Sequence, residues 1–413
     1  MTISSLVISL TLALDSLLAV SNVANTSDVG IMVYDLNTDS CLYERNARHT
    51  MRPASTQKLI TGITALENLG DYYQYTTSVC YTGSIDTAYV FCPDDSTYQL
   101  RRGSLQGNLY IIGAMDPKLN TDDLDILADE LYKMGIDTIA GNVCGDASFM
   151  NDNKYGKGWC WDDDNPELCS LLFGRKEALL PNFAKALRKA GIVILGDVVV
   201  RSCPSSASPL ISCTHSLPEI LERMMKDSNN TYAETMLYHL GAIQGKPATA
   251  KKGFALEEEL LKKIYAESPT QLTHGKTSVP SHRFADGSGL SLYNYLSPEI
   301  EVAFLRYAYT QKNIYPHLRE ALPIAGVDGT LEKRMRNTGA ENNVRAKTGT
   351  LTGVISLAGY CFTKDYHNIA FSIICNGCLS ADNARALQDK ICNILCNYQC
   401  TQSIPIIQNI PIE

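Results

Sequence analysis

Three short motifs, taken in their order along the chain, constrain the fold more than any other feature of the sequence. They are Ser55-Thr56-Gln57-Lys58, Ser228-Asn229-Asn230 and Lys347-Thr348-Gly349-Thr350. Each is weak alone: a Ser-x-x-Lys pattern is expected about once by chance in a chain of this size, a Ser-x-Asn pattern is usually a helix cap, and Lys-Thr-Gly is usually a turn. The set in this order is far more specific, because each member also has a fitting structural setting.

The first motif sits at a predicted helix start. Pro53 opens a helical segment that Gly70 ends, with a buried stripe between them. Ser55 and Lys58 are three positions apart and share a helix face, so the amine can reach the hydroxyl. A lysine can remove the serine proton only if burial or a nearby cation keeps the amine neutral. Backbone N–H groups at the helix start can stabilise an oxyanion.

The second and third motifs supply polar groups that could complete such a site. Ser228 and Asn230 lie between two helical segments, where a short turn can project a hydroxyl and a carboxamide into a cleft. The Lys347–Thr350 motif precedes a predicted strand, and Gly349 would let a substrate backbone approach the strand edge. Lysine and hydroxyl side chains there can hold a terminal carboxylate.

With these motifs, the sequence resembles the active-site-serine penicillin-recognising enzymes. More narrowly it resembles the D-alanyl-D-alanine carboxypeptidase/endopeptidase family, peptidase family S13, which is penicillin-binding protein 4-like. The resemblance runs from about Gly30 to the C-terminal helix and also includes the stretches Pro53–Lys58, Gly141–Val143, Asp286–Ser291, Gly326–Leu331 and Ala346–Val354. It implies an α+β fold: a β-lactamase-like transpeptidase domain, with an antiparallel sheet flanked by helices and a small α/β domain inserted between the first two motifs.

The resemblance also implies a mechanism. Lys58, kept neutral by the positive charge of Lys347, would take the proton of Ser55, which attacks the carbonyl of the penultimate D-alanine and forms an acyl-enzyme. Backbone N–H groups of Ser55 and Thr350 would stabilise the oxyanion. Water then releases the peptide, so the reaction is expected to need no metal and no organic cofactor.

The remaining motif residues receive supporting roles from the same resemblance. Ser228 would relay a proton to the leaving amine, and Asn230 would orient Lys58 and the substrate amide. Lys347, Thr348 and Thr350 would hold the substrate carboxylate. Trimming of a free stem peptide and cleavage of a cross-link both present a D-alanyl carbonyl, so both activities fit.

The expected domains follow from the spacing of the motifs. Ser55 and Ser228 are 228 − 55 = 173 positions apart, which predicts one insert domain, not two. We expect residues 1–24 to be a signal remnant or an N-terminal helix, residues 25–75 and 204–413 to form the peptidase domain, and residues 76–203 to form the insert. By resemblance, Asp146 in the insert lies near the position that meets the amino group of a diaminopimelate side chain; a turn aspartate is an equal alternative.

Local patterns predict several elements. Strand-like alternation covers Asp28 to Glu44, and further strands are expected at 107–112, 141–145, 354–362 and 368–375. Helices are expected at 122–134, 182–190, 220–225 and 232–240, and a C-terminal helix carries Cys392, Cys396 and Cys400 on one face.

The N-terminus and the cysteines leave alternatives open. The apolar stretch Ile3–Leu14 is too short to span a bilayer, and its leucines fit either a signal core or an amphipathic helix. No basic residue precedes Arg45. Among the 14 cysteines, short loops could be closed by Cys80–Cys92, Cys160–Cys169 and Cys203–Cys213 in an exported protein, or these thiols could be small buried hydrophobes. The spacing Cys375-x-x-Cys378 lacks a second pair, so zinc is not expected there.

Other functions are less well supported. The formal charge of −8 and the lack of a basic stripe argue against a nucleic-acid partner. We expect an exported, periplasmic bacterial protein without a transmembrane anchor. Its expected partners are peptidoglycan peptides and β-lactams. The sequence has no Gly-x-Ser-x-Gly, P-loop, His-Glu-x-x-His or Gly-x-Gly-x-x-Gly signature. A β-lactamase or esterase of the same fold, or an idle cell-wall binding protein, remains the alternative.

Overall fold

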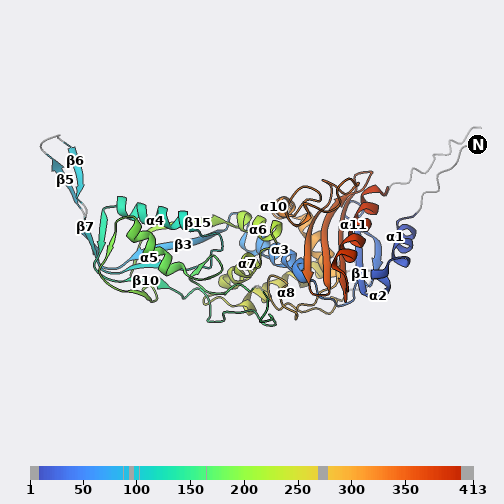
Figure 1. The fold of residues 1–413 in the computed structure, drawn as a ribbon, viewed down its shortest axis with the longest axis horizontal. Helices are drawn as coiled ribbons and strands as arrows, with labels where there is room; N and C mark the ends of the chain where they lie inside the picture. Colours follow the sequence, from blue (N-terminus) through green and yellow to red (C-terminus); the bar gives the residue numbers. More distant parts are fainter. Residues whose placement is uncertain are drawn as a thin grey trace, which may run out of the picture.

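Two β-sheets at opposite ends of an elongated molecule organise the chain (Figure 1). The computed structural model describes residues 9–86, 103–163, 165–267 and 278–400, together with the backbone of residues 88–92 and 97–101. A block of helices lies between the two sheets.

The first sheet has five antiparallel strands in the order β16-β17-β18-β1-β2. Its three inner strands, β17, β18 and β1, are almost entirely buried, because helices cover both faces of the sheet. The bounds of its strands are β1 Asp28–Asp35, β2 Ser40–Arg45, β16 Arg345–Leu351, β17 Val354–Phe362 and β18 Asn368–Asn376.

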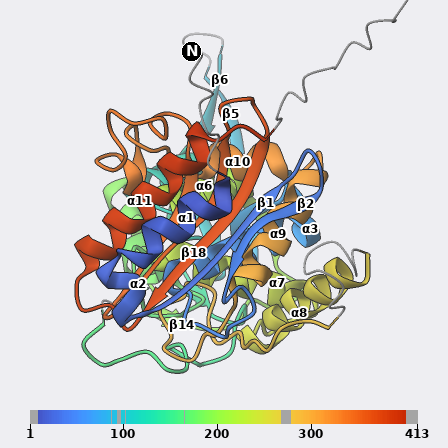
Figure 2. The same cartoon turned by 90° about the vertical axis from the view of Figure 1, so that its right-hand side faces the viewer.

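Helices α1 and α11 cover one face of this sheet, as Figure 2 shows. Leu10, Leu14 and Leu18 of α1 (Leu10–Ala19) are buried in the same cluster as Leu387 and Ile391 of α11 (Ala381–Asn397). The expected N-terminal helix is therefore present and packs on the sheet. The short helix α2 (Asn22–Thr26) links α1 to β1.

The other face packs against the helical block. At its centre, α3 (Gln57–Leu69) is buried along most of its length, because neighbouring helices surround it. The other members are α6 Leu217–Lys226, α7 Asn230–Ile243, α8 Ala250–Glu267, α9 Pro298–Thr310 and α10 Tyr315–Ala321, with 3₁₀ helices η1 Ala54–Thr56 and η2 Gly329–Leu331.

The other end of the molecule is formed by residues 74–216 and is called its second half. It contains a five-stranded sheet in the order β14-β10-β8-β3-β15 and a four-stranded sheet in the order β13-β9-β7-β4. Parallel pairing of β8, β10 and β14 accompanies the helices α4 and α5, as strand–helix alternation predicts. The bounds are β3 Gln74–Tyr81, β4 Ser84–Ile85, β5 Ala88–Cys92, β6 Thr97–Arg101, β7 Gly103–Gln106, β8 Leu109–Ile112, α4 Thr121–Lys133, β9 Ile136–Ile139, β10 Val143–Asp146, β11 Leu172–Phe173, β12 Lys176–Glu177, α5 Leu179–Lys189, β13 Val193–Ile194, β14 Val198–Val200 and β15 Ser208–Ser216.

The Lys347–Thr350 motif precedes a strand as expected, β17, but it also lies in a strand that was not predicted, the edge strand β16. The division into domains stays a prediction. Strand β15 nevertheless begins after residue 203 and pairs with β3, so the sheet of the second half extends to Ser216.

Cys160, Cys169, Cys203 and Cys213 carry free thiols in this structure, so the two loops that they could close are open. The side chain of Cys92 lies outside the described residues. None of the described helices combines the length and the apolar composition that a membrane span requires.

Candidate active site

Ser55 lies in η1, directly before α3, and Lys58 lies in the first turn of α3. The Lys58 amine is 2.9 Å from Ser55 Oγ, 2.8 Å from Asn230 Oδ1 and 2.7 Å from the backbone oxygen of Ser288. The last two are acceptors only, so a neutral amine donates its two N–H groups to them and its lone pair faces the Ser55 hydroxyl. This geometry suits proton transfer from Ser55 to Lys58.

Burial lowers the pKa of Lys58 to about 7, although the nearby carboxyl groups of Asp286 and Glu234 oppose the shift. The positive charge of Lys347, which the sequence reasoning made responsible, is not the cause. The influence runs the other way: burial and the charge of Lys58 hold the pKa of Lys347 well below its usual value. Because both amines are fully buried and close together, Lys58 and Lys347 are not both protonated unless an anion binds beside them.

The second motif is brought to the same place by the turn between α6 and α7. Asn229, not Ser228, caps α7, because the Asn229 side chain accepts the backbone N–H of Tyr232. Ser228 has a left-handed φ of +57°, a conformation that non-glycine residues adopt rarely. Its hydroxyl is therefore free of the capping role and lies 2.8 Å from the Lys347 amine.

The third motif lies on β16, alongside the nucleophile. A Cβ atom at Gly349 would lie 2.1 Å from Ser356 Oγ, 2.8 Å from the oxygen of Pro53 and 2.9 Å from the nitrogen of Ser55. Glycine is required here so that the strand can pack against the Ser55 backbone, which is a different reason from the substrate approach inferred from sequence. The Lys347 amine also donates to the oxygen of Thr348, at 2.7 Å.

Buried carboxyl groups beneath the site were missed by sequence reasoning. Glu234 accepts the backbone N–H groups of Gly287 and Ser288, at 3.1 and 2.9 Å, and so holds the segment whose carbonyl binds Lys58. Burial, together with the charge of Asp286, raises the pKa of Glu234. Single acidic residues inside helical patterns give no sequence signal that separates them from surface residues.

A second missed network ties Lys157 and Trp159 to this segment. The Trp159 indole donates to Asp286 Oδ2 at 2.8 Å, and Ser291 Oγ donates to the backbone oxygen of Lys157 at 2.7 Å. The other oxygen of Asp286 accepts the backbone N–H of Gly289 at 2.7 Å. Lys157 and Trp159 therefore contact the Asp286–Ser291 stretch, which is part of the family resemblance.

A cavity of about 290 Å³ opens beside the motif residues. Its lining includes Ser228 and Asn230, together with Arg175 from the β11–β12 hairpin and Leu290. Nothing in the sequence around Arg175 indicated this position. A substrate that enters this cavity meets the second motif and Arg175 at once.

Asp146 has its hydrogen bonds within the second half of the molecule. Its two carboxylate oxygens accept the backbone N–H groups of Ser148 and Cys203, both at 2.7 Å. These bonds fit the turn-aspartate alternative. A substrate contact for Asp146 stays a prediction.

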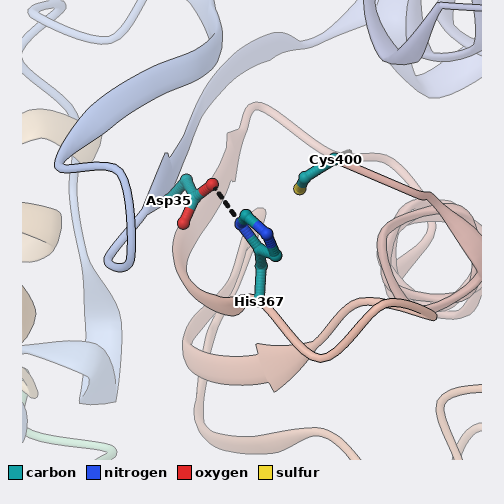
Figure 3. Close-up of side chains that lie close together, drawn as sticks. All are labelled: Asp35, His367 and Cys400. Carbon is teal, nitrogen blue, oxygen red and sulfur yellow. Dashed lines mark hydrogen bonds and ion pairs between the residues drawn. The ribbon is translucent and has the colours of Figure 1, made fainter. Parts of the chain in front are cut away.

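Groups that could hold a metal ion lie away from Ser55. Among the described residues, three groups could hold an ion, and within each group the ligand atoms lie within 4.8 Å of one another. The groups are Asp35, His367 and Cys400; Asp123, Cys213 and His215; and Cys160, Asp162 and Asp163. Figure 3 shows the first of these, in which His367 is bonded to Asp35. None of the three includes a residue of the motifs, and the pair Cys375 and Cys378 is not among them.

Comparisons with known proteins identify the family. A family model described as the D-Ala-D-Ala carboxypeptidase 3 (S13) family matches residues 10–169 and 173–398. The D-alanyl-D-alanine carboxypeptidase DacB of Haemophilus influenzae is 26% identical, with 86% of this chain and 87% of that protein covered. The D-alanyl-D-alanine carboxypeptidase of Actinomadura sp. (strain R39) is 27% identical, with 89% and 81% covered.

Solved structures show the same fold. Penicillin-binding protein 4 of Haemophilus influenzae has a TM-score of 0.79 at 23% identity and covers 93% of this chain and 99% of that chain. A predatory endopeptidase of Bdellovibrio bacteriovorus, solved with an immunity protein, has a TM-score of 0.55 at 17% identity and covers 89% and 94%. The predicted α+β fold of the penicillin-binding proteins is confirmed.

Proposed function

The chain belongs to the D-Ala-D-Ala carboxypeptidase 3 (S13) family and is a serine-type peptidase, and we propose that it cleaves the D-alanyl ends of peptidoglycan peptides through an acyl-enzyme on Ser55. One observation carries the proposal: a buried Lys58 amine, whose pKa is about 7, lies 2.9 Å from the Ser55 hydroxyl. A nucleophile and a base within hydrogen-bond distance are the minimum for acyl transfer by serine.

Acylation begins with proton transfer. The Lys58 lone pair takes the hydroxyl proton, while its two N–H groups stay bonded to Asn230 and Ser288. Ser55 Oγ then attacks the carbonyl carbon of the penultimate D-alanine. The backbone N–H groups of Ser55 and Thr350 stabilise the oxyanion, a role supported by the close packing of β16 against the Ser55 backbone.

The leaving D-alanine needs a proton and its carboxylate needs a cation. Ser228 Oγ, which lies 2.8 Å from the Lys347 amine, relays to the leaving nitrogen the proton that Lys58 took from Ser55, so Lys58 is neutral again. The substrate carboxylate brings the negative charge that lets Lys347 become protonated, and the hydroxyls of Thr348 and Thr350 complete its binding. Thr348 is already oriented by a 2.7 Å hydrogen bond to Thr330.

Deacylation uses water, so these steps need no metal or organic cofactor. We propose peptidoglycan peptides as substrates and β-lactams as acylating inhibitors, in line with the β-lactam complex solved for the Haemophilus penicillin-binding protein 4. Such a substrate places the enzyme outside the cytoplasmic membrane, so we propose an exported, periplasmic protein.

Products from defined muropeptides test this function. Mass spectrometry should detect loss of one D-alanine from a pentapeptide, splitting of a cross-linked dimer, or both, and Ser55→Ala should abolish either product. An unchanged pentapeptide and dimer, with a folded protein, would favour an idle binding protein. Rapid turnover of benzylpenicillin in place of a stable adduct would favour a β-lactamase of the same fold.

A further inference from the structure

Asp123, Cys213 and His215 form a cluster that peptide cleavage at Ser55 does not use. Their carboxylate, thiol and imidazole ligand atoms all lie within 4.8 Å of one another. Cys213 and His215 are two positions apart on β15, so their side chains leave the strand on the same face. Asp123 lies in the first turn of α4, where it also closes a capping box with Asn120.

The imidazole of His215 is oriented by a fourth residue. Asp116, whose side chain is fully buried, lies 2.7 Å from His215 Nδ1. Because an ionised carboxylate can only accept, Nδ1 carries the proton and donates it. The other nitrogen, Nε2, is then aimed at Asp123, with 3.7 Å between Nε2 and Oδ2.

The distance of 3.7 Å is too long for a hydrogen bond but suits two ligands of one ion. Metal–ligand bonds of about 2.0 Å to nitrogen and oxygen place tetrahedral ligand atoms roughly 3.3 Å apart. A positive charge between Nε2 and Asp123 can be either a proton on Nε2, which makes the contact an ion pair, or a metal ion bound to both atoms. Lys118, a nearby cation, is held by an ion pair with Glu219.

We propose that Asp123, Cys213 and His215 bind one Zn²⁺ ion, with Asp116 as the residue that orients His215. Imidazole nitrogen, carboxylate oxygen and thiolate sulfur are all ligands of zinc, and a buried carboxylate that accepts from the second ring nitrogen is the usual partner of a zinc-bound histidine. Binding displaces the thiol proton of Cys213 to solvent, and water fills the fourth position.

Such an ion would act on the structure rather than on the reaction at Ser55. It would join the start of α4 to the end of β15. The next residue after His215 is Ser216, which caps α6, and α6 leads directly to the second motif at Ser228. The ion would therefore fix the second half of the molecule relative to the turn that carries Ser228.

The cluster in Figure 3 provides a matched control, because it has the same three residue types. There the imidazole nitrogen that faces the carboxylate is already bonded: His367 Nδ1 lies 2.7 Å from Asp35 Oδ2. A metal ion would have to break that bond. We therefore expect the two clusters to differ in metal affinity.

Titration of the chelator-treated, full-length chain with Co²⁺ tests the proposal, because cobalt replaces zinc and reports its ligands by absorption. We expect one equivalent to produce a thiolate-to-cobalt charge-transfer band that Zn²⁺ then removes. Cys213→Ser should abolish the band and Cys400→Ser should keep it. Asp116→Asn should weaken Co²⁺ binding by about 10- to 100-fold.

Circular dichroism shows whether each variant is folded, and this measurement does not depend on the reaction at Ser55. Absence of the band in the unmodified chain, or its survival in Cys213→Ser, would overturn the proposal. His215 would then be an imidazolium held between two carboxylates. Loss of the band in Cys400→Ser alone would place the metal at the other cluster and equally refute the assignment.

Discussion

Replacement of Gly349 by alanine tests how closely β16 must pack against the nucleophile. The added Cβ would lie 2.9 Å from the Ser55 nitrogen and 2.8 Å from the Pro53 oxygen, and ordinary contact begins at 3.4 Å. The backbone must therefore move apart by about 3.4 − 2.9 = 0.5 Å at Ser55 and about 3.4 − 2.8 = 0.6 Å at Pro53. The Ser356 hydroxyl, at 2.1 Å, can rotate away, but it then loses its bond to Pro53.

This displacement should lower both the acylation rate constant and the free energy of unfolding. Misplacement of a catalytic group by about 1 Å costs about 100-fold in rate, so a shift of about half that should lower the acylation rate constant by about 10- to 100-fold. Overpacking of a buried site should lower the free energy of unfolding by about 1–3 kcal/mol. Stopped-flow acylation by a fluorescent penicillin measures the first quantity, and urea unfolding measures the second.

Gly145→Ala is a matched control, because its Cβ would meet side chains of Leu171 and Leu180, at 2.9 and 3.1 Å, far from the third motif in the chain. It should destabilise the protein without slowing acylation. Normal acylation in Gly349→Ala would refute the reasoning. Equal slowing in both variants would show that general destabilisation, and not displacement of Ser55, is the cause.

Three further predictions follow from the same contacts. Lys58→Ala should lower the acylation rate by about 100- to 10,000-fold, the usual contribution of a general base, with an unchanged circular dichroism spectrum; near-normal acylation would exclude Lys58 as the base. Because the pKa of Lys58 is lowered to about 7, the acylation rate of the unmodified enzyme should rise as pH increases through about 7 and level off above it; a flat stopped-flow profile across that range would contradict this assignment. Trp159→Phe leaves Asp286 Oδ2 without its indole donor and should lower the urea unfolding free energy by about 1–3 kcal/mol, whereas an unchanged midpoint would mean that water replaces the bond.

Elements with a strong periodic pattern could be predicted from the sequence. The strands expected at 354–362 and 368–375 are observed at Val354–Phe362 and Asn368–Asn376, because buried β-branched and apolar runs bounded by turns leave little choice. The helix that starts after Ser55 and ends at Gly70 is observed for a similar reason: a proline near its start and a glycine at its end.

Other elements depend on tertiary contacts that the sequence does not display. Helix α8 (Ala250–Glu267) was not predicted, although along its sequence charged residues alternate with the residues of its buried face. The Lys347–Thr350 motif was expected just before the strand at 354–362, but pairing with that strand, β17, makes the motif itself a strand.

The residues of the site likewise include some that the sequence could predict and some that it could not. Ser55, Lys58, Ser228, Asn230 and Lys347 could be chosen from motif order, and the structure brings them together. The cause of the low Lys58 pKa could not be predicted, since burial is a property of the whole fold. The same holds for Glu234, whose hydrogen bonds reach residues more than fifty positions away.

The central claim is that Ser55 forms a covalent acyl-enzyme, and intact-protein mass spectrometry after incubation with benzylpenicillin measures it most directly. The unmodified chain should gain the mass of one penicilloyl group, with the adduct mapped to the peptide that contains Ser55. Ser55→Ala should gain nothing, because no other nucleophile faces the Lys58 lone pair among the residues that the structure describes. An adduct of the same mass on Ser55→Ala, or none on the folded unmodified chain, would contradict the account.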